Sequence, residues 1–577
     1  MSAPAHGGSL RNLLVTEARA EALRSQAFDL PSVTLSRRQL CDLELLLNGA
    51  FSPLEGFLCR ADYEQVLATG RLADGTLWPI PVTLALAQAN AEGIEQGKPL
   101  VLRDEEGFML AVVKAAELWQ PDQALEAEAV YGTASTEHPG VRTLLQAGAA
   151  VYVGGQVEGV QLPTHFDFQA LWHTPQELRR QFNQSGWREV IAFQTSRPIH
   201  RLQRDLTLEM AKSEQANLLL HPAVGVTKPG DLEYYARVHC YQSVLAYFPL
   251  NIAMLSLLPL AMRMAGPREA LWHGIIHKNY GCSAFIVGPD DSSPPAADGQ
   301  SRFYERYAAQ EYVAGFADQL GIRLISVEER RYVPARGCYL PVGQIEQEAE
   351  ALSPMSDGDL KHTLARGEGV PEWFSFPEVL RHLERVHPPH SQLGFTLFFT
   401  GLSGSGKSTL ARILHARLIE NGQRPVTLLD GDIVRRNLSS ELGFSREHRD
   451  LNIRRIGFVA NEISKNGGVA VCAPIAPYQA TRRDIRQLIA QYGAFIEIYL
   501  ATPLAVCESR DRKGLYAKAR EGLIPHFTGI SDPYQEPQQA ELTIDTSGLT
   551  PMEAAQQILL YLVREGFIDA DAASAIQ

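Results

Sequence analysis

Apolar positions over residues 1–167 come in short runs that proline and glycine interrupt. These runs are residues 78–84, 99–102, 108–113 and 150–154. Short apolar runs bounded by turn-forming residues are typical of strands. We therefore predict a β-rich N-terminal domain with a helical start over residues 1–167.

The pattern changes at about residue 168, where apolar strand-like runs begin to alternate with helical periodicity. The strand-like runs are residues 189–193, 215–220 and 284–288. A helix is predicted to begin after Thr174, because Glu177 follows at the spacing of a capping box. The alternation predicts a doubly wound α/β domain over residues 168–325. A small polar and helical segment, closed by a linker with consecutive prolines, follows over residues 326–390.

Strand and helix patterns alternate again over residues 391–577, and this part opens on a glycine-rich loop. An apolar run at residues 395–399 leads into the loop, and apolar residues then recur at helical spacing up to residue 421. The loop reads Gly401-Leu402-Ser403-Gly404-Ser405-Gly406-Lys407-Ser408-Thr409, which matches the phosphate-binding pattern GxxxxGK[ST]. Further strand-like runs are residues 426–429, 469–473 and 495–500. The fold class predicted for the whole chain is multidomain α/β, with a parallel sheet in the C-terminal domain.

Each part of the glycine-rich loop suits a polyphosphate. Glycines let backbone N–H groups curl around phosphate oxygens, and the N-terminus of the following helix adds its dipole. Lys407 supplies a positive charge, and the hydroxyl of Ser408 is placed to bind Mg²⁺. The sequence therefore predicts an ATP site with Mg²⁺ as its cofactor.

Composition narrows the range of partners. The chain has 577 residues, of which 45% are hydrophobic and 21% charged, as in ordinary globular proteins of several domains. A formal net charge of −13 argues against a nucleic-acid partner, since phosphate contacts require a basic face. The seven cysteines are scattered without a CxxC pair, so reduced thiols and a cytoplasmic location are expected. No signal-peptide pattern opens the sequence and prolines interrupt its most membrane-like window, so no membrane partner is expected.

Two carboxylates, Asp430 and Asp432, follow the apolar run at residues 426–429. Doubly wound folds bind their ligands at the carboxyl ends of parallel strands. We expect one carboxylate to orient Mg²⁺-bound water and the other to accept a hydroxyl proton during phosphoryl transfer. The catalytic candidates are therefore Lys407, Asp430 and Asp432.

Arginines crowd the residues after these carboxylates. They are Arg435, Arg436, Arg449, Arg454, Arg455, Arg482 and Arg483. A guanidinium group binds phosphate or sulfate through paired hydrogen bonds, which predicts an anionic second substrate. A solvent-facing position is the simpler interpretation for Arg454 or Arg483. Residues 510–518 are basic and contain a glycine, which predicts a mobile lid over the phosphates.

Motifs across residues 391–570 resemble those of adenylylsulfate (APS) kinase. Beyond the glycine-rich loop they are residues 429–435 (LDGDIVR), 442–455 (LGFSREHRDLNIRR), 513–516 (KGLY) and 527–530 (FTGI). The resemblance implies transfer of the γ-phosphoryl group of MgATP to the 3′-hydroxyl of adenosine 5′-phosphosulfate, giving 3′-phosphoadenosine 5′-phosphosulfate (PAPS). It also implies that Arg510 joins the loop in binding ATP. The implied APS pocket is lined by Asp432, Arg435, Phe444, Arg449, Asn452, Ile475, Ala476, Lys513 and Phe527, with the two phenylalanines stacking on adenine.

One position in the APS pocket departs from the pattern of that family. APS kinases usually read Ile-Ser-Pro-Tyr where this chain has Ile475-Ala476-Pro477-Tyr478, and the serine is sometimes phosphorylated. Ala476 forms no such intermediate. In-line transfer between two bound nucleotides needs positioning and charge stabilisation, so activity is expected to survive.

Residues 1–385 resemble ATP sulfurylase, which makes APS from ATP and sulfate. The resemblance rests on residues 49–57, 220–231, 258–272, 278–282 and 371–378. It implies a PUA-like fold for residues 1–167 and a sulfurylase-like fold for residues 168–325. Homo-oligomers are common in both families, so a dimer or hexamer is expected.

The sulfurylase signature is altered at two places. Sulfurylases read Gln-Thr-Arg-Asn-Pro-x-His-x-x-His, and from Gln194 to Gln203 this chain keeps His200 but has Ser196 for the sulfate-holding arginine and Gln203 for the second histidine. Arg197 is not expected to substitute, because a shift of one residue along an extended segment reverses the direction of a side chain.

The second altered place is a loop that sulfurylases write Gly-Arg-Asp-His-Ala-Gly-Pro. Here Pro289 replaces another anion-binding arginine, and Asp291 adds a negative charge. At about 1.5–3 kcal/mol per charged hydrogen bond, losing two arginines costs about 3–6 kcal/mol, or about 10²–10⁴ in affinity. We predict no useful sulfurylase activity.

These patterns leave three hypotheses for the function. The favoured one is an APS kinase whose sulfurylase-like domain serves assembly, regulation or binding of an altered ligand. The second is a fully bifunctional PAPS synthase that uses Arg197 and His200 in a rearranged site. The third is a nucleotide-sensing, non-catalytic scaffold, which the intact loop, Asp430 and Asp432 disfavour.

Overall fold

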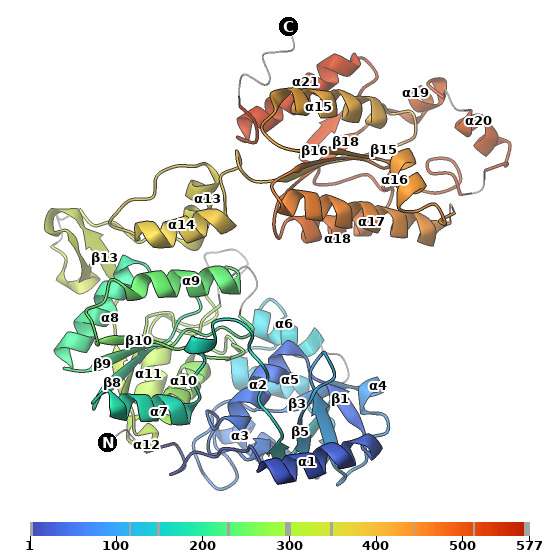
Figure 1. The fold of residues 1–577 in the computed structure, drawn as a ribbon. Coiled ribbons are helices and arrows are strands. Elements are labelled where there is room, and N and C mark those ends of the chain that lie inside the picture. Colours follow the sequence, from blue (N-terminus) through green and yellow to red (C-terminus); the bar gives the residue numbers. More distant parts are fainter. Residues whose placement is uncertain are drawn as a thin grey trace. The chain divides into compact units, whose positions relative to one another are not determined.

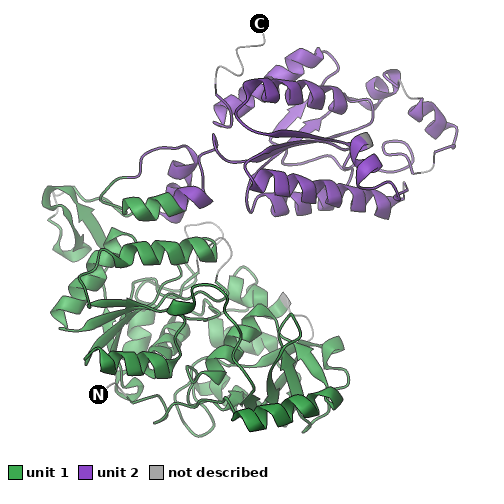
Figure 2. Cartoon of the chain, viewed as in Figure 1, with its two compact units in different colours: residues 1–354, 371–382 green, residues 355–370, 383–577 purple. Residues whose placement is uncertain are grey.

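The structure, a computed structural model, describes most of the chain (Figure 1). The described residues are 4–114, 117–146, 150–227, 231–294, 302–346, 350–443, 445–511, 514–524 and 526–569, and at residues 146, 150 and 432 only the backbone is described. Two compact units are distinguished in Figure 2. Unit 1 comprises residues 1–354 and 371–382, and unit 2 comprises residues 355–370 and 383–577.

The first sheet of unit 1 is organised around β7, which pairs antiparallel with β2, β3, β5 and β6. Its strands are β1 (Ser32–Thr34), β2 (Gly56–Phe57), β3 (Leu84–Ala87), β4 (Leu100–Arg103), β5 (Met109–Val113), β6 (Glu117–Trp119) and β7 (Ala150–Gly159). The helices of this part are α1 (Glu17–Gln26), α2 (Arg37–Leu47), α3 (Arg60–Thr69), α4 (Gln88–Ala91), α5 (Gln123–Tyr131) and α6 (Pro139–Gln146). The prediction of a β-rich start to the chain is confirmed.

The strand predicted over residues 78–84 is wrong except at its last residue, where β3 begins. Pro79 and Pro81 have no N–H to donate to a neighbouring strand, which disfavours pairing in the middle of a sheet. The apolar character of the run reflects burial instead, because Trp78 is fully buried and packs edge-on against Phe51.

The second sheet of unit 1 is wholly parallel, with strand order β10-β9-β8-β11-β12. Its strands are β8 (Val190–Phe193), β9 (Asn217–Leu220), β10 (Ala253–Leu255), β11 (Ala284–Val287) and β12 (Arg323–Ser326). Its helices are α7 (Pro175–Gln184), α8 (Arg201–Ser213), α9 (Tyr234–Leu245), α10 (Pro267–Asn279), α11 (Ala308–Ala314) and α12 (Ala317–Leu320). The capping box at Thr174 and Glu177 is present at the start of α7, as predicted. Among the described residues, no helix is long and apolar enough to cross a membrane.

The small segment that follows contains a hairpin and two helices. The hairpin pairs β13 (Arg330–Val333) with β14 (Cys338–Pro341), and the helices are α13 (Asp357–Ala365) and α14 (Pro377–Val386). The residues of this segment divide between the units, since residues 355–370 belong to unit 2 and residues 371–382 to unit 1.

The sheet of unit 2 is also wholly parallel, with strand order β16-β17-β15-β18-β19. Its strands are β15 (Phe395–Gly401), β16 (Val426–Asp430), β17 (Val469–Ala473), β18 (Ala494–Leu500) and β19 (Leu542–Ile544). Its helices are α15 (Lys407–Asn421), α16 (Gly431–Asn437), α17 (Arg446–Lys465), α18 (Gln479–Ile489), α19 (Leu504–Ser509), α20 (Leu515–Arg520) and α21 (Pro551–Arg564). The parallel α/β sheet predicted for the C-terminal part is confirmed.

Side chains of β15 alternate between two cores. Phe395, Leu397 and Phe399 pack with residues of α15 and α21, whereas Phe398 packs with residues of α17 and α18. Figure 1 shows these helix pairs on opposite faces of the sheet. Because β15 is buried on both faces, its carboxyl end holds the glycine-rich loop in a fixed place.

Candidate functional site

The glycine-rich loop joins β15 to α15 and requires its glycines. Gly404 and Gly406 have φ angles of +80° and +100°, in the left-handed region that other residues rarely adopt. A Cβ atom at Gly404 would also lie 2.7 Å from the carbonyl oxygen of Cys507. The loop therefore keeps its backbone N–H groups at the N-terminus of α15, where an anion is stabilised.

Lys407, the first residue of α15, is buried at the base of the loop. Its Nζ donates to the carbonyl oxygens of Gly401 at 2.9 Å and Leu402 at 2.6 Å. Burial lowers the pKa of Lys407 to about 8. Carbonyl oxygens are neutral partners for an ammonium group, so a phosphate would supply the counter-charge.

Ser408 and Asp430 provide oxygen atoms that face each other across the loop. Ser408 Oγ lies 3.5 Å from Asp430 Oδ1, and Arg412 lies 4.0 Å from Asp430 Oδ2. A hydroxyl and a carboxylate are oxygen ligands of the kind that Mg²⁺ takes beside a nucleotide, so these residues fit the predicted cofactor. The backbone of Asp432 lies in the first turn of α16, and its side chain lies outside the described part of the structure.

Arg449 connects three segments that carry predicted APS-binding residues. From the first turn of α17 it donates to Thr528 Oγ1 at 2.9 Å, to the Tyr478 hydroxyl at 3.0 Å and to Asp532 Oδ2 at 3.0 Å. Asn452 lies one turn further along α17 and is buried. Among the described residues, nothing hydrogen-bonds Nε of Arg449 or Oδ1 of Asn452. Buried polar atoms in such a state favour a ligand that pairs with both.

The loop after β17 holds Ile475 and Ala476 in an unusual conformation. Ala476 is buried with φ of +46°, which is a strained angle for alanine. Its carbonyl oxygen accepts a hydrogen bond from Arg482 at 2.7 Å, and that of Ile475 accepts one from Thr400 at 2.7 Å. Arg482 is itself buried in an ion pair with Glu497 at 2.8 Å. A buried network therefore fixes this edge of the predicted pocket.

Phe527 and α20 lie beside the glycine-rich loop. The ring of Phe527 meets that of Tyr516 edge-on, with centroids 5.1 Å apart, and the Tyr516 hydroxyl donates to Ser403 O at 2.8 Å. Arg510 donates to Thr546 Oγ1 and O, both at 2.9 Å. Tyr516 is a residue that sequence analysis missed as a site candidate, although it belongs to the quoted KGLY motif.

The other residues predicted for the APS pocket, and the arginines near them, do not all point to one site. Arg435 donates to the carbonyl oxygens of Leu442 at 3.2 Å and Gly443 at 3.3 Å. Phe444 and Lys513 lie outside the described residues. Arg454 forms an exposed ion pair with Asp484 at 2.7 Å, as a solvent-facing arginine would. The arginines after Asp430 are thus not all directed to one pocket.

In unit 1, the two altered loops follow β8 and β11, the neighbouring strands at which the chain reverses its course across the sheet. Both loops meet His273 of α10. Gln194 lies 3.1 Å from Nε2 of His273 and 3.1 Å from Nε2 of His277, and Ser292 Oγ lies 3.4 Å from Nδ1 of His273. Gln194 of the first loop and Ser292 of the second therefore come together at His273 of α10.

The side chains at these loops give little positive charge. Ser196 is buried and its carbonyl oxygen accepts from Arg237 at 3.0 Å, whereas the next residue, Arg197, is exposed. Burial lowers the pKa of His277 well below its usual range and that of His221 to about 3, so both imidazoles are neutral near pH 7.

The other predicted residues of this site have structural contacts. His200 Nδ1 lies 2.7 Å from Ser375 Oγ, and Gln203 Oε1 accepts from His200 N at 3.1 Å at the start of α8. The carbonyl oxygen of Pro289 accepts from Tyr307 N at 2.8 Å. Asp291 Oδ1 accepts from Ser292 Oγ at 2.8 Å, and burial raises the pKa of Asp291.

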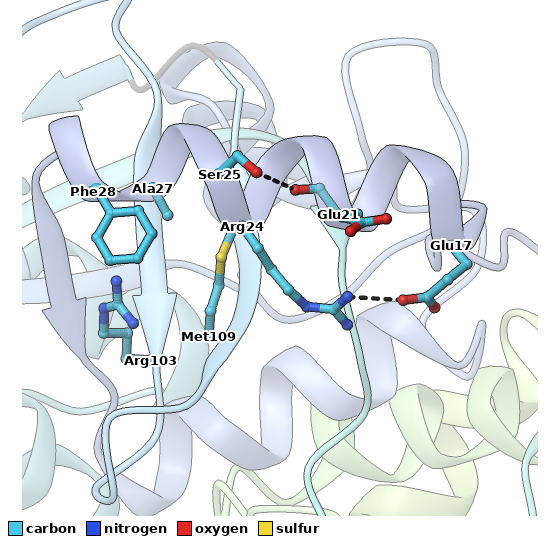
Figure 3. Close-up of a pocket in the computed structure, with 8 residues that line it drawn as sticks. All are labelled: Glu17, Glu21, Arg24, Ser25, Ala27, Phe28, Arg103 and Met109. Atoms are coloured by element: carbon cyan, nitrogen blue, oxygen red, sulfur yellow. Dashed lines mark hydrogen bonds and ion pairs between the residues drawn. The ribbon is translucent and has the colours of Figure 1, made fainter.

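A surface pocket of about 530 Å³ lies elsewhere in unit 1, between α1 and the first sheet (Figure 3). It is lined by Glu17, Glu21, Arg24, Ser25, Ala27, Phe28, Arg103 and Met109. Arg24 already pairs with Glu17 at 2.8 Å. The pocket contains none of the residues predicted for either nucleotide site.

Comparisons with known proteins place all three parts of the chain. Family models match residues 3–162 (PUA-like domain), 169–386 (ATP-sulfurylase) and 393–545 (adenylylsulphate kinase). A sulfate adenylyltransferase of Phaeosphaeria nodorum is 45% identical over 572 residues, which is 98% of this chain and 100% of its own length. One of Chaetomium globosum is 46% identical over 568 residues, or 98% and 99% of the two chains. A solved structure described as a hexameric APS kinase from Thiobacillus denitrificans matches with a TM-score of 0.81 and 41% identity, over 98% of this chain and 100% of that one.

Proposed function

The chain belongs to the sulfate adenylyltransferase family and carries an adenylylsulphate kinase domain, and on that premise we propose that it phosphorylates APS. The γ-phosphoryl group of MgATP would pass to the 3′-hydroxyl of APS, giving ADP and PAPS. One observation carries the proposal: Ser408 and Asp430 face each other beside buried Lys407, at the sheet edge where the loop that contains Ile475 begins. Donor phosphate and acceptor nucleotide would therefore meet at the carboxyl ends of β15, β16 and β17.

Different residues would bind ATP, the phosphoryl donor, and APS, the phosphoryl acceptor. The N–H groups of the loop and Lys407 would hold the β- and γ-phosphates of ATP. Ser408 and Asp430 would hold Mg²⁺, which neutralises phosphate charge when bound. Asp432 is the candidate to accept the proton of the attacking 3′-hydroxyl as the bond from that oxygen to phosphorus forms and the bond to the β–γ bridging oxygen breaks.

The acceptor pocket is assigned from Arg449 and Asn452. APS offers anionic oxygens to the Nε–H of Arg449, and it offers hydroxyl and amine hydrogens to Oδ1 of Asn452. Both protein atoms are buried and, within the described residues, unpaired. Phe527 would stack against the adenine ring.

An assay of PAPS formation from APS and MgATP tests the kinase assignment. The wild-type chain should form PAPS, and Lys407→Ala should lower turnover by at least about a hundredfold, because a charge that stabilises the transferring phosphoryl group is lost. Lys465→Ala, a change near a tyrosine ring at the end of α17, is the matched control and should leave turnover unchanged. A wild-type chain that forms no PAPS would show that the kinase assignment is wrong.

We further propose that the sulfurylase-like part has lost its activity. Ser196 and Pro289 stand where sulfurylases carry anion-binding arginines, and Asp291 adds a carboxylate beside them. A bifunctional PAPS synthase is the alternative, and it is favoured by the relatives, which are named sulfate adenylyltransferases. Incubation with ATP, sulfate and a pyrophosphatase separates the two, since formation of APS, or of PAPS made from it at the kinase site, would support the bifunctional alternative.

We also propose a homo-oligomer, since the relative from Thiobacillus denitrificans is described as hexameric. Analytical ultracentrifugation should give a mass several times that of the 63.7 kDa chain. A sedimenting monomer at micromolar concentration would contradict this assembly.

A further inference from the structure

The guanidinium group of Arg449 is an anchor for three separate stretches of chain. Tyr478 ends the loop that holds Ile475 and Ala476, and Thr528 directly follows Phe527. Arg449 donates to both of these side chains from α17. Any residue that fixes this guanidinium therefore fixes how the three stretches face the acceptor nucleotide.

Asp532 is the residue that fixes it. Its Oδ2 accepts from Arg449 Nη2 at 3.0 Å and from the Tyr478 hydroxyl at 2.8 Å. The side chains of Arg449 and Asp532 are only 13% and 14% exposed, so water screens this ion pair weakly.

The backbone of Asp532 also closes the turn that presents Phe527. Its N–H donates to Phe527 O at 3.1 Å, and its carbonyl oxygen accepts from Gly529 N at 2.8 Å. The turn and the guanidinium are thus held by one residue, which sequence analysis did not single out.

The contacts of Arg449 leave its Nε–H for a ligand. Nη1 and Nη2 each have an acceptor, whereas Nε–H has none among the described residues. A guanidinium group is planar, so fixing its two terminal nitrogens also fixes the direction of Nε–H.

We propose that Asp532 is a positioning residue for the acceptor nucleotide. It holds Arg449 so that Nε–H is directed to an anionic oxygen of the sulfonucleotide, without itself touching the substrate. Because the pocket is assigned to APS under the proposed function, this role of Asp532 rests on that proposal.

Steady-state kinetics of Asp532→Asn test this role. The change keeps the shape and removes the charge, so the KM for APS should rise about tenfold to a hundredfold, as expected when a charged hydrogen bond loses its direction. The KM for ATP should stay within about twofold, since Lys407 and Ser408 lie in a different loop. Asp484→Asn removes the exposed partner of Arg454 on the same helix and is the matched control, with neither KM changed.

A merely structural role would raise both KM values together and lower the melting temperature. A double variant decides whether Asp532 acts through Arg449: Asp532→Asn combined with Arg449→Lys should be no worse than Arg449→Lys alone. Should Asp532→Asn fail to fold, Tyr478→Phe replaces it, because loss of that hydroxyl should raise the KM for APS a few-fold.

The outcomes separate this role from the kinase assignment. An active wild type whose KM for APS is unchanged in Asp532→Asn, or in Tyr478→Phe where Asp532→Asn does not fold, overturns the role of Asp532 alone. A wild type that forms no PAPS overturns the kinase assignment itself.

Discussion

The two five-stranded parallel sheets of this chain differ in the charge at their carboxyl edges. In unit 2, buried Lys407 lies at this edge, and Arg449 of α17, which is 13% exposed, contacts Tyr478 of the loop that follows β17. In unit 1, the loops of the corresponding edge carry Ser196 and Asp291, with neutral histidines beneath them. Both sheets therefore have the layered architecture that binds nucleotides, and the side chains at their strand ends differ in charge.

The largest effect is expected when positive charge is restored to the altered loops of unit 1. Replacing Ser196 and Pro289 with arginine, together with Arg197→Asn and Asp291→His, should strengthen ATP binding to unit 1 by up to about 10²–10⁴, since two charged hydrogen bonds are worth about 3–6 kcal/mol. Calorimetry in a Lys407→Ala background measures this site apart from the kinase site.

PAPS formation is the control for this quadruple variant. With Lys407 intact, the quadruple variant should form PAPS as fast as the wild type does, because all four substitutions lie in unit 1. If the wild type already binds ATP in unit 1 as tightly as the variant does, the difference in charge between the sheets has no functional meaning.

A second comparison uses one buried ion pair from each unit. Arg263 with Asp42 in unit 1 and Arg482 with Glu497 in unit 2 are both almost fully buried. Neutralising one member leaves a buried charge unpaired, so Asp42→Asn and Glu497→Gln should each lower the free energy of unfolding of its own unit by about 3–5 kcal/mol. Scanning calorimetry of the full chain measures the two losses.

The two ion-pair variants should differ in kinase activity. Glu497→Gln should also impair PAPS formation, because Arg482 holds the carbonyl oxygen of Ala476. Asp42→Asn should leave it intact. Glu64→Gln, which breaks an exposed pair with Arg60, is the control and should change stability by less than about 1 kcal/mol. Equal loss of PAPS formation in both ion-pair variants would contradict this separation.

A third prediction concerns the metal side of the kinase site. Asp430→Asn should lower kcat by about 10²–10³ and raise the Mg²⁺ concentration needed for half-maximal rate, because a charged ligand of the ion becomes neutral. The KM for APS should change little. Glu420→Gln, at the exposed end of α15, is the control. An unchanged Mg²⁺ requirement would show that Ser408 and Asp430 do not hold the ion.

Local signals explain why much of unit 2 was predictable. The strand before the loop, the loop glycines and the start of α15 lie within one short stretch, and each constrains its own backbone. The capping box of α7 was predictable for the same reason. The strand predicted over residues 78–84 was wrong because an apolar run can indicate burial without strand pairing. Trp78 is buried but belongs to no strand.

Residues whose contacts join distant segments escaped prediction. Asp532 lies 83 positions from Arg449 in the chain, and its place beside that guanidinium depends on packing that no local pattern encodes. Tyr516 reaches Ser403 across 113 positions in the same way. The motifs therefore indicated the segments of the site, and the fold was needed to identify what holds them together.

The smallest expected effect is a pH dependence that belongs to unit 2. Burial lowers the pKa of Lys407 to about 8, so this side chain is charged below pH 8 and neutral above it. Phosphate binding favours the charged form, so kcat/KM for ATP should fall by up to about tenfold per pH unit above pH 8. Binding of MgATP near pH 8.5 should be accompanied by proton uptake, which calorimetry in buffers of different ionisation enthalpy measures.

The same lowered pKa of Lys407 affects stability in the opposite direction. The unfolded chain holds a proton on lysine up to about pH 10.4. Between pH 8 and that value the unfolded state therefore binds more protons, and the contribution of Lys407 to the free energy of unfolding should rise with pH. Above pH 8, the affinity of the wild type for ATP should therefore fall, while the contribution of Lys407 to the stability of unit 2 rises. Lys407→Met should remove both of these pH dependences. The KM for APS should stay flat over this range, since arginine does not titrate there. A KM for ATP that is also flat from pH 7 to 9.5 would show that Lys407 keeps its proton throughout and that its burial carries no cost.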